Sequence, residues 1–151
     1  MMNQNFSGIA IRKAALDDLA IIKELYSQLT SDTANVEKDF PTILKDPNSL
    51  CLILEKETPI GMVICYIRTS LSSGKKMIID EIIIDKPFRG KGYGHTLMEH
   101  CITVAKTMNV DCVELTCSLT NPELHSFYEG MGFEHTMRLY HLYVGDEENG
   151  S

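Results

Sequence analysis

The sequence lacks several features that would assign the chain to a specialised class. No apolar run approaches the roughly 20 residues that a membrane-spanning helix needs. Residues 1–7 are polar and short, so no secretory signal segment is predicted. The 5 cysteines are odd in number and contain no C-x-x-C pair, which argues against a disulfide framework and a structural zinc site. These absences predict a reduced, cytoplasmic protein without a metal site or a membrane partner.

An excess of positive charge is also missing. The chain has 14 lysines and arginines against 21 acidic residues and a net charge of -7, which argues against a nucleic-acid partner. Its 44% hydrophobic and 23% charged residues are ordinary for a globular protein, and 151 residues suit one core. The sequence shows neither a repeat nor a linker. We predict a single domain over residues 1–151, with its core at about 8–144 and a frayed tail at 145–151.

Hydrophobic periodicity predicts a mixed α/β (α+β) fold. Alternating or short apolar runs indicate strands, whereas apolar residues at helical spacing indicate helices. The predicted helices cover residues 16–29, 36–45, about 95–109 and 121–130, and the predicted extended segments cover 8–14, 50–55, 60–68, 77–84, 110–117 and 133–144. The run 77–84 has little polar interruption and is predicted to be the central strand. The element order is β-α-α-β-β-β-α-β-α-β.

One short stretch, DKPFRGKGYGHTLM at residues 85–98, concentrates positive charge and glycine in this acidic chain. A strand that feeds a glycine-rich turn and then a helix can bind an anion, because the first N–H groups of the helix are unpaired and its dipole favours negative charge. The stretch lacks the Gly-Lys-Ser/Thr ending of a P-loop, and its glycines are spaced G-x-G-x-G rather than G-x-G-x-x-G. A different phosphate-binding loop is therefore indicated.

Two motifs together resemble the GNAT superfamily of N-acetyltransferases. The letters RGKGYG match the R/Q-x-x-G-x-G/A pyrophosphate loop of that family, although Lys86 stands where many members have proline. The letters NPELHSFYEGMGF, residues 121–133, resemble its second signature, in which Asn is followed seven residues later by Tyr and then by Gly-Phe. The resemblance spans about residues 9–144. It implies the GNAT fold, with a mixed central sheet whose central strands splay apart, and acetyl-CoA as cosubstrate.

The resemblance also implies roles for individual residues. The pantetheine arm of acetyl-CoA would lie along the central strand, and the pyrophosphate would lie on the glycine loop. Asn121 would cap its helix and bond the pantetheine amide, and Tyr128 would both contact acetyl-CoA and act as the general acid that protonates the departing thiolate. The implied cofactor-binding residues are Ile82, Ile83, Ile84, Arg89, Gly90, Lys91, Gly92, Tyr93, Gly94, Asn121 and Tyr128.

A general base is useful because an aliphatic amine is mostly protonated at neutral pH, with a pKa near ~10.4. Family members that have a base on the central strand carry it nine or eleven residues before the loop's Arg/Gln, and counting back from Arg89 gives Asp80 and Ile78. Ile78 cannot accept a proton, so Asp80 is the candidate base, and a water relay is the alternative. Glu81 is expected to be structural or next to the substrate. Adjacent strand residues face opposite sides, so only one of the two carboxylates is expected to face the acceptor.

The predicted function is acetyl transfer from acetyl-CoA to a primary amine, most simply that of a small molecule. The length and motifs are similar to those of small-amine enzymes, including aminoalkylphosphonate N-acetyltransferases. Arg68, Lys75 and Lys76 could meet an anionic group of the acceptor, although solvated loop lysines are the simpler interpretation. Two alternatives stay open, a protein or peptide acetyltransferase and a non-catalytic acyl-CoA-binding module. The apolar, aromatic late segment, with Tyr140 and Leu142, adds the possibility of a homodimer.

Overall fold

The structure, a computed structural model, describes residues 8–145. The chain falls into two compact units, Met1–Leu115 and Thr116–Ser151, and each is described by itself. Five strands and three of the four α-helices belong to the first unit, and the fourth helix belongs to the second. The tail predicted to be frayed lies, apart from Gly145, outside the described residues.

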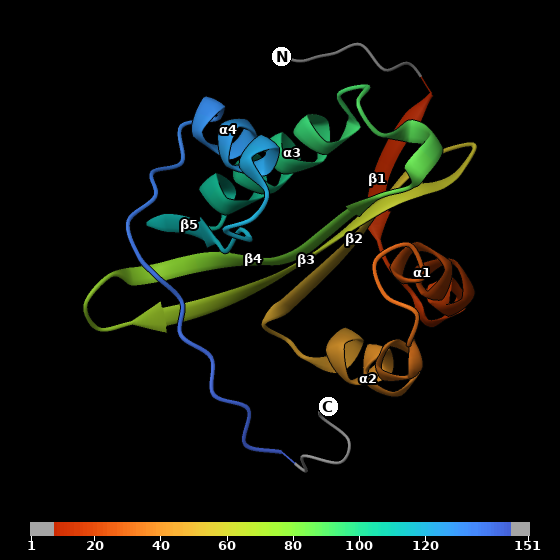
Figure 1. Ribbon diagram of the computed structural model, residues 1–151, viewed down its shortest axis with the longest axis horizontal. Coiled ribbons are helices and arrows are strands. Elements are labelled where there is room, and N and C mark those ends of the chain that lie inside the picture. The colour runs from red at the N-terminus through yellow and green to blue at the C-terminus, as the bar shows by residue number, and fades with distance from the viewer. Residues whose placement is uncertain (1–7, 146–151) are drawn as a thin grey trace. The chain divides into compact units, whose positions relative to one another are not determined.

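A five-stranded mixed sheet forms the frame of the first unit (Figure 1). The strands lie in the order β1-β2-β3-β4-β5, and all neighbours are antiparallel except β4 and β5, which are parallel. Their bounds are β1 Ile9–Lys13, β2 Ser49–Lys56, β3 Thr58–Ser70, β4 Gly74–Ile84 and β5 Cys112–Leu115. The predicted strands before residue 120 are thereby confirmed, and β4 is flanked on both sides, as its apolar composition predicts.

Helices cover both faces of this sheet (Figure 1). On one face, α1 (Leu19–Tyr26) and α2 (Ala34–Lys45) pack over β2, β3 and β4, and a 3-10 turn, η1 (Leu16–Asp18), leads into α1. On the other face lies α3 (Tyr93–Thr107), where the Sγ atom of Cys101 is 3.8 Å from that of Cys65 on β3. No helix among residues 8–145 is long and apolar enough to cross a membrane.

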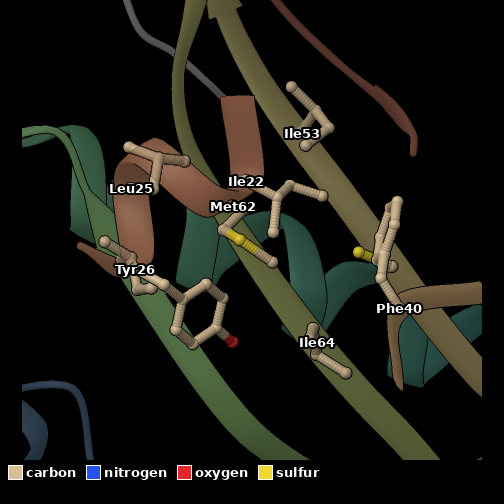
Figure 2. Packing of buried hydrophobic residues seen from close by; sticks show 9 residues of the cluster. Ile22, Leu25, Tyr26, Phe40, Ile53, Met62 and Ile64 are labelled. Carbon is tan, nitrogen blue, oxygen red and sulfur yellow. The ribbon is translucent and has the colours of Figure 1, made fainter. Parts of the chain in front are cut away.

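The core under α1 and α2 holds these elements together, and Figure 2 shows its side chains. Ile22 and Leu25 of α1, Phe40 of α2, and Ile53 and Met62 of the sheet belong to one buried cluster (Figure 2). Each of these five side chains is buried, with at most 3% of its surface exposed. Since fully burying one such side chain contributes about 1.5–3 kcal/mol, this cluster holds α1 and α2 against β2 and β3.

The hairpin between β3 and β4 is tighter than the sequence indicates. The predicted strands 60–68 and 77–84 leave a loop of several residues between them, but β3 runs to Ser70 and β4 begins at Gly74, so only residues 71–73 lie between the strands. Gly74 has a φ of 78°, a left-handed conformation that glycine adopts without steric cost. A side chain at this position would also meet Asp111 Oδ2 at 2.3 Å. A glycine here therefore allows both the turn and the close approach of the chain before β5.

The second unit contains α4 (Pro122–Gly130). As predicted, Asn121 caps it by accepting a hydrogen bond from the Leu124 N–H at 3.2 Å, and Pro122 occupies the first turn, where its missing N–H costs no helical hydrogen bond. The expectation of a strand after this helix is wrong within the described residues, because 133–145 contain no strand. A strand requires hydrogen bonds to a neighbour, and no backbone hydrogen bond to residues 134–145 is found among the described residues.

Candidate active site

The glycine loop connects β4 to α3 through a short 3-10 turn, η2 (Lys86–Phe88). Gly90 and Gly92 have φ values of 75° and 92°, and Gly92 is the N-cap of α3. Gly92 has no side chain with which to cap the helix, and no described residue accepts a hydrogen bond from the Gly94 N–H. The loop thus presents backbone donors at the positive end of a 15-residue helix, as an anion requires.

The loop side chains have distinct surroundings. Arg89 donates from Nε to the Ile84 carbonyl oxygen at 2.7 Å and from Nη2 to Gln28 Oε1 at 3.0 Å. Lys91 is exposed and has no ion-pair partner among the described residues. Tyr93 is 4% exposed, and its hydroxyl accepts a hydrogen bond from Lys56 Nζ at 3.0 Å. Arg89 and Tyr93 therefore stabilise the loop and its helix, whereas the ammonium group of Lys91 remains open to an anion.

Beside the loop, the last part of β4 has one edge that β5 does not cover. The pairing of β4 with β5 ends at Ile79 and Leu115, which matches the predicted splay. On the other edge, the Asp85 N–H bonds the carbonyl oxygen of Ile60 at 2.8 Å, and antiparallel bonding alternates from residue to residue. By this alternation Ile83 directs its polar backbone groups to β3, and Ile82 directs its own to the uncovered edge.

Ile84 lies on the same uncovered edge as Ile82. Its carbonyl oxygen already accepts from Arg89, so its N–H is the group left at that edge. An extended chain that contains amides can add to such an edge as another strand would. Of the three isoleucines predicted to bind the pantetheine arm, Ile82 and Ile84 are thus oriented for backbone pairing, and the buried Ile83 side chain supports the strand from the core.

The two carboxylates of β4 lie where its pairing with β3 is interrupted. Glu81 pairs with Ile64 and Ile79 pairs with Cys65, so Asp80 is the extra residue of a β-bulge. Side chains of directly opposed residues lie on the same face of a sheet. Ile64 belongs to the core under α1 and α2, whereas Cys65 faces α3. In a regular strand, Ile79 and Glu81 would lie on the same face of the sheet. Because of the bulge, they lie on opposite faces.

The negative charges of Asp80 and Glu81 both contribute to raised pKa values of tyrosines on the face that α1 and α2 cover. Burial raises the pKa of Tyr26 most, followed by its hydrogen bond to Glu81, and the charge of Asp80 adds to the increase. Burial also raises the pKa of Tyr66, with further contributions from Asp80 and Glu81. Strict alternation is interrupted at this bulge, and which of the two carboxylates faces the acceptor stays a prediction. Tyr26 donates to Glu81, whereas no described residue hydrogen-bonds to the Asp80 carboxylate.

The lysines considered for an anionic acceptor group are engaged inside the first unit. Lys76 is 9% exposed, and its Nζ lies 3.2 Å from Glu114 Oε2. Lys75 donates from Nζ to the Met108 carbonyl oxygen at 2.9 Å. Neither is the solvated loop lysine that the sequence indicates, because both belong to β4. Arg68 remains exposed.

In the second unit, Tyr128 is buried, with 9% of its surface exposed. Its ring makes edge-to-face contacts with Phe127 and Phe133, at centroid distances of 5.2 and 5.9 Å. Burial raises the pKa of Tyr128, and the charge of Cys117 contributes to the increase. No described residue hydrogen-bonds to its hydroxyl, although buried hydroxyl groups usually have a partner. Such a group is available to a ligand.

Two features of the site were not predicted. Gln28 hydrogen-bonds to the loop entrance, and Tyr26 hydrogen-bonds to Glu81. Both residues lie at the end of α1, and no local motif in the sequence indicates contacts with a segment more than fifty residues away. Among residues 8–145, no group of three or more His, Cys, Asp or Glu side chains is placed to hold a metal ion.

Comparison with known proteins agrees with these features. A profile described as the Acetyltransferase (GNAT) family matches residues 15–133. An uncharacterized N-acetyltransferase of Methanocaldococcus jannaschii is 35% identical over 78 residues, which cover 50% of this chain and 34% of that protein. N-alpha-acetyltransferase 30 of Schizosaccharomyces pombe is 29% identical over 98 residues, which cover 65% of each chain. The matches thus span about a third to two thirds of these relatives' length.

The fold is also found among solved structures. Glucosamine-6-phosphate N-acetyltransferase from Arabidopsis thaliana aligns with a TM-score of 0.75 at 24% identity. The alignment covers 91% of this chain and 99% of the Arabidopsis chain. At this identity the likeness shows a shared fold.

Proposed function

Because the chain belongs to the Acetyltransferase (GNAT) family, we propose that it transfers the acetyl group of acetyl-CoA directly to a primary amine, most simply that of a small molecule. The observation that carries this proposal is the glycine loop at the start of α3, which lies next to the uncovered edge of β4. The loop offers backbone donors to a pyrophosphate, and the edge offers them to the amides of a pantetheine arm.

In the proposed complex, the Gly92–Gly94 backbone and Lys91 bind the pyrophosphate. Ile82 and Ile84 pair with the pantetheine arm, and an N–H of this strand donates to the thioester oxygen. Negative charge develops on that oxygen when the amine attacks, so a donor held in place lowers the barrier. Asn121 would bond a pantetheine amide in addition to capping α4.

The ammonium form of the acceptor first loses one proton to water, and the attack of the neutral amine then needs two further proton transfers. As the amine nitrogen bonds to the carbonyl carbon, its proton passes to Asp80, either directly or through water, and the carbon–sulfur bond breaks. The departing thiolate, with a pKa of about 8.5, takes the hydroxyl proton of Tyr128. Two observations support Asp80 and Tyr128: the carboxylate has no described hydrogen-bond partner, and the Tyr128 hydroxyl is buried without one.

The acceptor side favours a positively charged amine over one that carries an anionic group. Glu81 lies on the same face as Ile64, Asp80 is its neighbour on β4, and both residues are exposed, so their negative charge would attract an ammonium group. Lys75 and Lys76 are engaged elsewhere, which argues against the aminoalkylphosphonate type of acceptor. A peptide amine is the second candidate, because the relative from Schizosaccharomyces pombe bears the name N-alpha-acetyltransferase 30.

A titration and an acceptor screen test the proposal. We expect acetyl-CoA to bind and the Lys91→Gln variant to bind it several-fold more weakly, because a cation next to the pyrophosphate is lost. Lys106→Gln, at the far end of α3, is the matched control and should bind normally. Thiol release is then measured with diamines, amino sugars and peptides as acceptors. Turnover of peptides alone would reject the small-molecule acceptor, and binding without any turnover would favour a non-catalytic acyl-CoA module.

A further inference from the structure

A single amide side chain joins the end of α1 to the entrance of the glycine loop. Gln28 Oε1 accepts from the Lys86 N–H at 3.0 Å and from Arg89 Nη2 at 3.0 Å. Gln28 Nε2 donates to Asp85 Oδ1 at 2.6 Å. Three residues of the loop entrance are therefore bonded to one residue that lies more than fifty positions earlier in the chain.

The chemistry of the amide suits this position. Asp85 supplies an acceptor, whereas Lys86 and Arg89 supply donors, so the joining side chain must donate and accept at once. A carboxylate could bond the two donors but would repel Asp85, and an ammonium group would do the reverse. The primary amide of Asn or Gln offers both functions in one small planar group without a charge, and Gln28 has the longer reach of the two.

The residues that Gln28 bonds determine where the loop begins. The Asp85 N–H is fixed to the carbonyl oxygen of Ile60, and the Arg89 guanidinium bridges Gln28 Oε1 and the carbonyl oxygen of Ile84. Gly90 and Gly92 follow immediately, and their left-handed conformations can curl the backbone in more than one way. An anchor on the residue before them limits the positions that the loop can take.

We propose that Gln28 is a positioning residue for acetyl-CoA. It holds Lys86 and Arg89 so that the amides of the glycine loop are already placed for the pyrophosphate, which reduces the ordering that binding would otherwise require. This role rests on the proposed function, since it assumes that the loop binds acetyl-CoA. Gln28 also lies two residues after Tyr26, which donates a hydrogen bond to Glu81. The end of α1 thus contacts both a carboxylate of β4 and the entrance of the glycine loop.

The test replaces the amide with an apolar side chain of similar length, Gln28→Met. We expect acetyl-CoA to bind the variant about tenfold more weakly, the loss that one hydrogen bond to a charged group can account for. The KM for acetyl-CoA should rise in proportion, whereas kcat at saturation should stay within twofold, because no reacting atom is touched. Ser27→Ala is the matched control. It removes the neighbouring bond to the Glu24 carbonyl oxygen and leaves the loop contacts intact.

A second variant separates positioning from general destabilisation. In an Arg89→Met background, Gln28→Met should cost less affinity than it does in the wild type, because one of the three loop contacts of Gln28 is already gone. Gln28→Asn, whose amide is too short to reach all three partners, should weaken binding even if Gln28→Met does not fold. Unchanged affinity in a folded Gln28 variant would overturn the role, as would an equal loss in the Arg89→Met background. A wild-type protein that does not bind acetyl-CoA would instead overturn the proposed function on which this role rests.

Discussion

Residues 8–115 and residues 116–145 show what the same kind of sequence does with and without a neighbouring strand. In the first region, apolar residues lie on five paired strands, and Ile53, Leu54 and Met62 are fully buried. In the second, residues 136–144 are also rich in apolar and aromatic residues, yet Leu142 and Tyr143 are each 85% exposed. β-propensity describes how well a residue fits a paired, half-buried surface. Residues 136–144 have a composition that suits a strand, but they have no hydrogen-bonded neighbour among the described residues and therefore stay irregular.

The two regions also divide the proposed chemistry. The first holds the glycine loop, the uncovered edge of β4 and Asp80, which would bind the cosubstrate and accept a proton. The second holds Tyr128, whose proposed role is to deliver one. Variants that separate binding from turnover therefore test this division directly.

The largest effect is expected for Tyr128→Phe. The substitution keeps the ring contacts with Phe127 and Phe133 and removes only the hydroxyl, so stability and acetyl-CoA affinity should change little. Turnover should fall by the ~10² to 10⁴ that general acid catalysis supplies. The measurement is kcat beside the dissociation constant for acetyl-CoA. A drop in affinity without a drop in kcat would show that this region contributes binding rather than acid catalysis.

The pH profile provides the control for this variant. A general acid must be protonated, and burial raises the pKa of Tyr128, so the proton is retained to a higher pH than in a free tyrosine. The alkaline decline of wild-type kcat should accordingly begin above pH ~10, and this limb should be absent in Tyr128→Phe. An identical alkaline limb in both proteins would assign the decline to another group.

The second prediction compares a buried residue of the first region with an exposed residue of the second. Ile53→Ala empties a fully buried site beneath α1 and α2 and should lower the free energy of unfolding by about 3 kcal/mol. Leu142→Ala removes a side chain that is 85% exposed and should change it by less than ~0.5 kcal/mol. Denaturant titration measures both. A large loss for Leu142→Ala would mean that the late segment is covered in solution, as the predicted homodimer requires.

Much of the first region could be predicted from its sequence because local pattern and tertiary partner agree there. The alternation of 8–14, the hairpin of 50–68 and the apolar run 77–84 each become paired strands. The start of α4 was predictable for the same reason, since Asn121 and Pro122 are local capping signals. The prediction of a strand at 133–144 was wrong because it was based only on the local apolar pattern. Strand formation also requires a neighbouring strand, which the local pattern does not reveal.

The residues of the candidate site also differ in how far a local sequence pattern predicts them. The glycine loop could be predicted because the residues that form it are adjacent in the sequence. The bulge at Asp80 could not, because it depends on how β4 registers against β3, and no residue type marks that shift. Gln28 was missed because its three contacts lie across the fold. Residues whose roles come from long-range geometry leave no periodic or motif signal in a single sequence.

The smallest effects are expected within the glycine loop, where two neighbouring glycines differ in conformation. Gly92 has a φ of 92°, a region that L-residues adopt at a cost of about 1 kcal/mol, so Gly92→Ala should destabilise the free protein by about that amount. Gly94 lies inside the first turn of α3 without a left-handed φ, and a methyl group there would meet Ile84 Cγ1 at an ordinary 3.8 Å.

Gly94→Ala should therefore stabilise the free protein by roughly 0.5 kcal/mol, since alanine loses less backbone freedom on folding than glycine. Its affinity for acetyl-CoA should be retained, because the backbone donors keep their places and the family loop accepts Gly or Ala at this position. Gly92→Ala should weaken acetyl-CoA binding in addition to stability, because strain at the N-cap moves the amides that follow it. Thermal unfolding with and without acetyl-CoA measures both quantities in one experiment. Equal ligand-induced shifts of the melting temperature in the two variants would show that the conformation of Gly92 does not control the anion site.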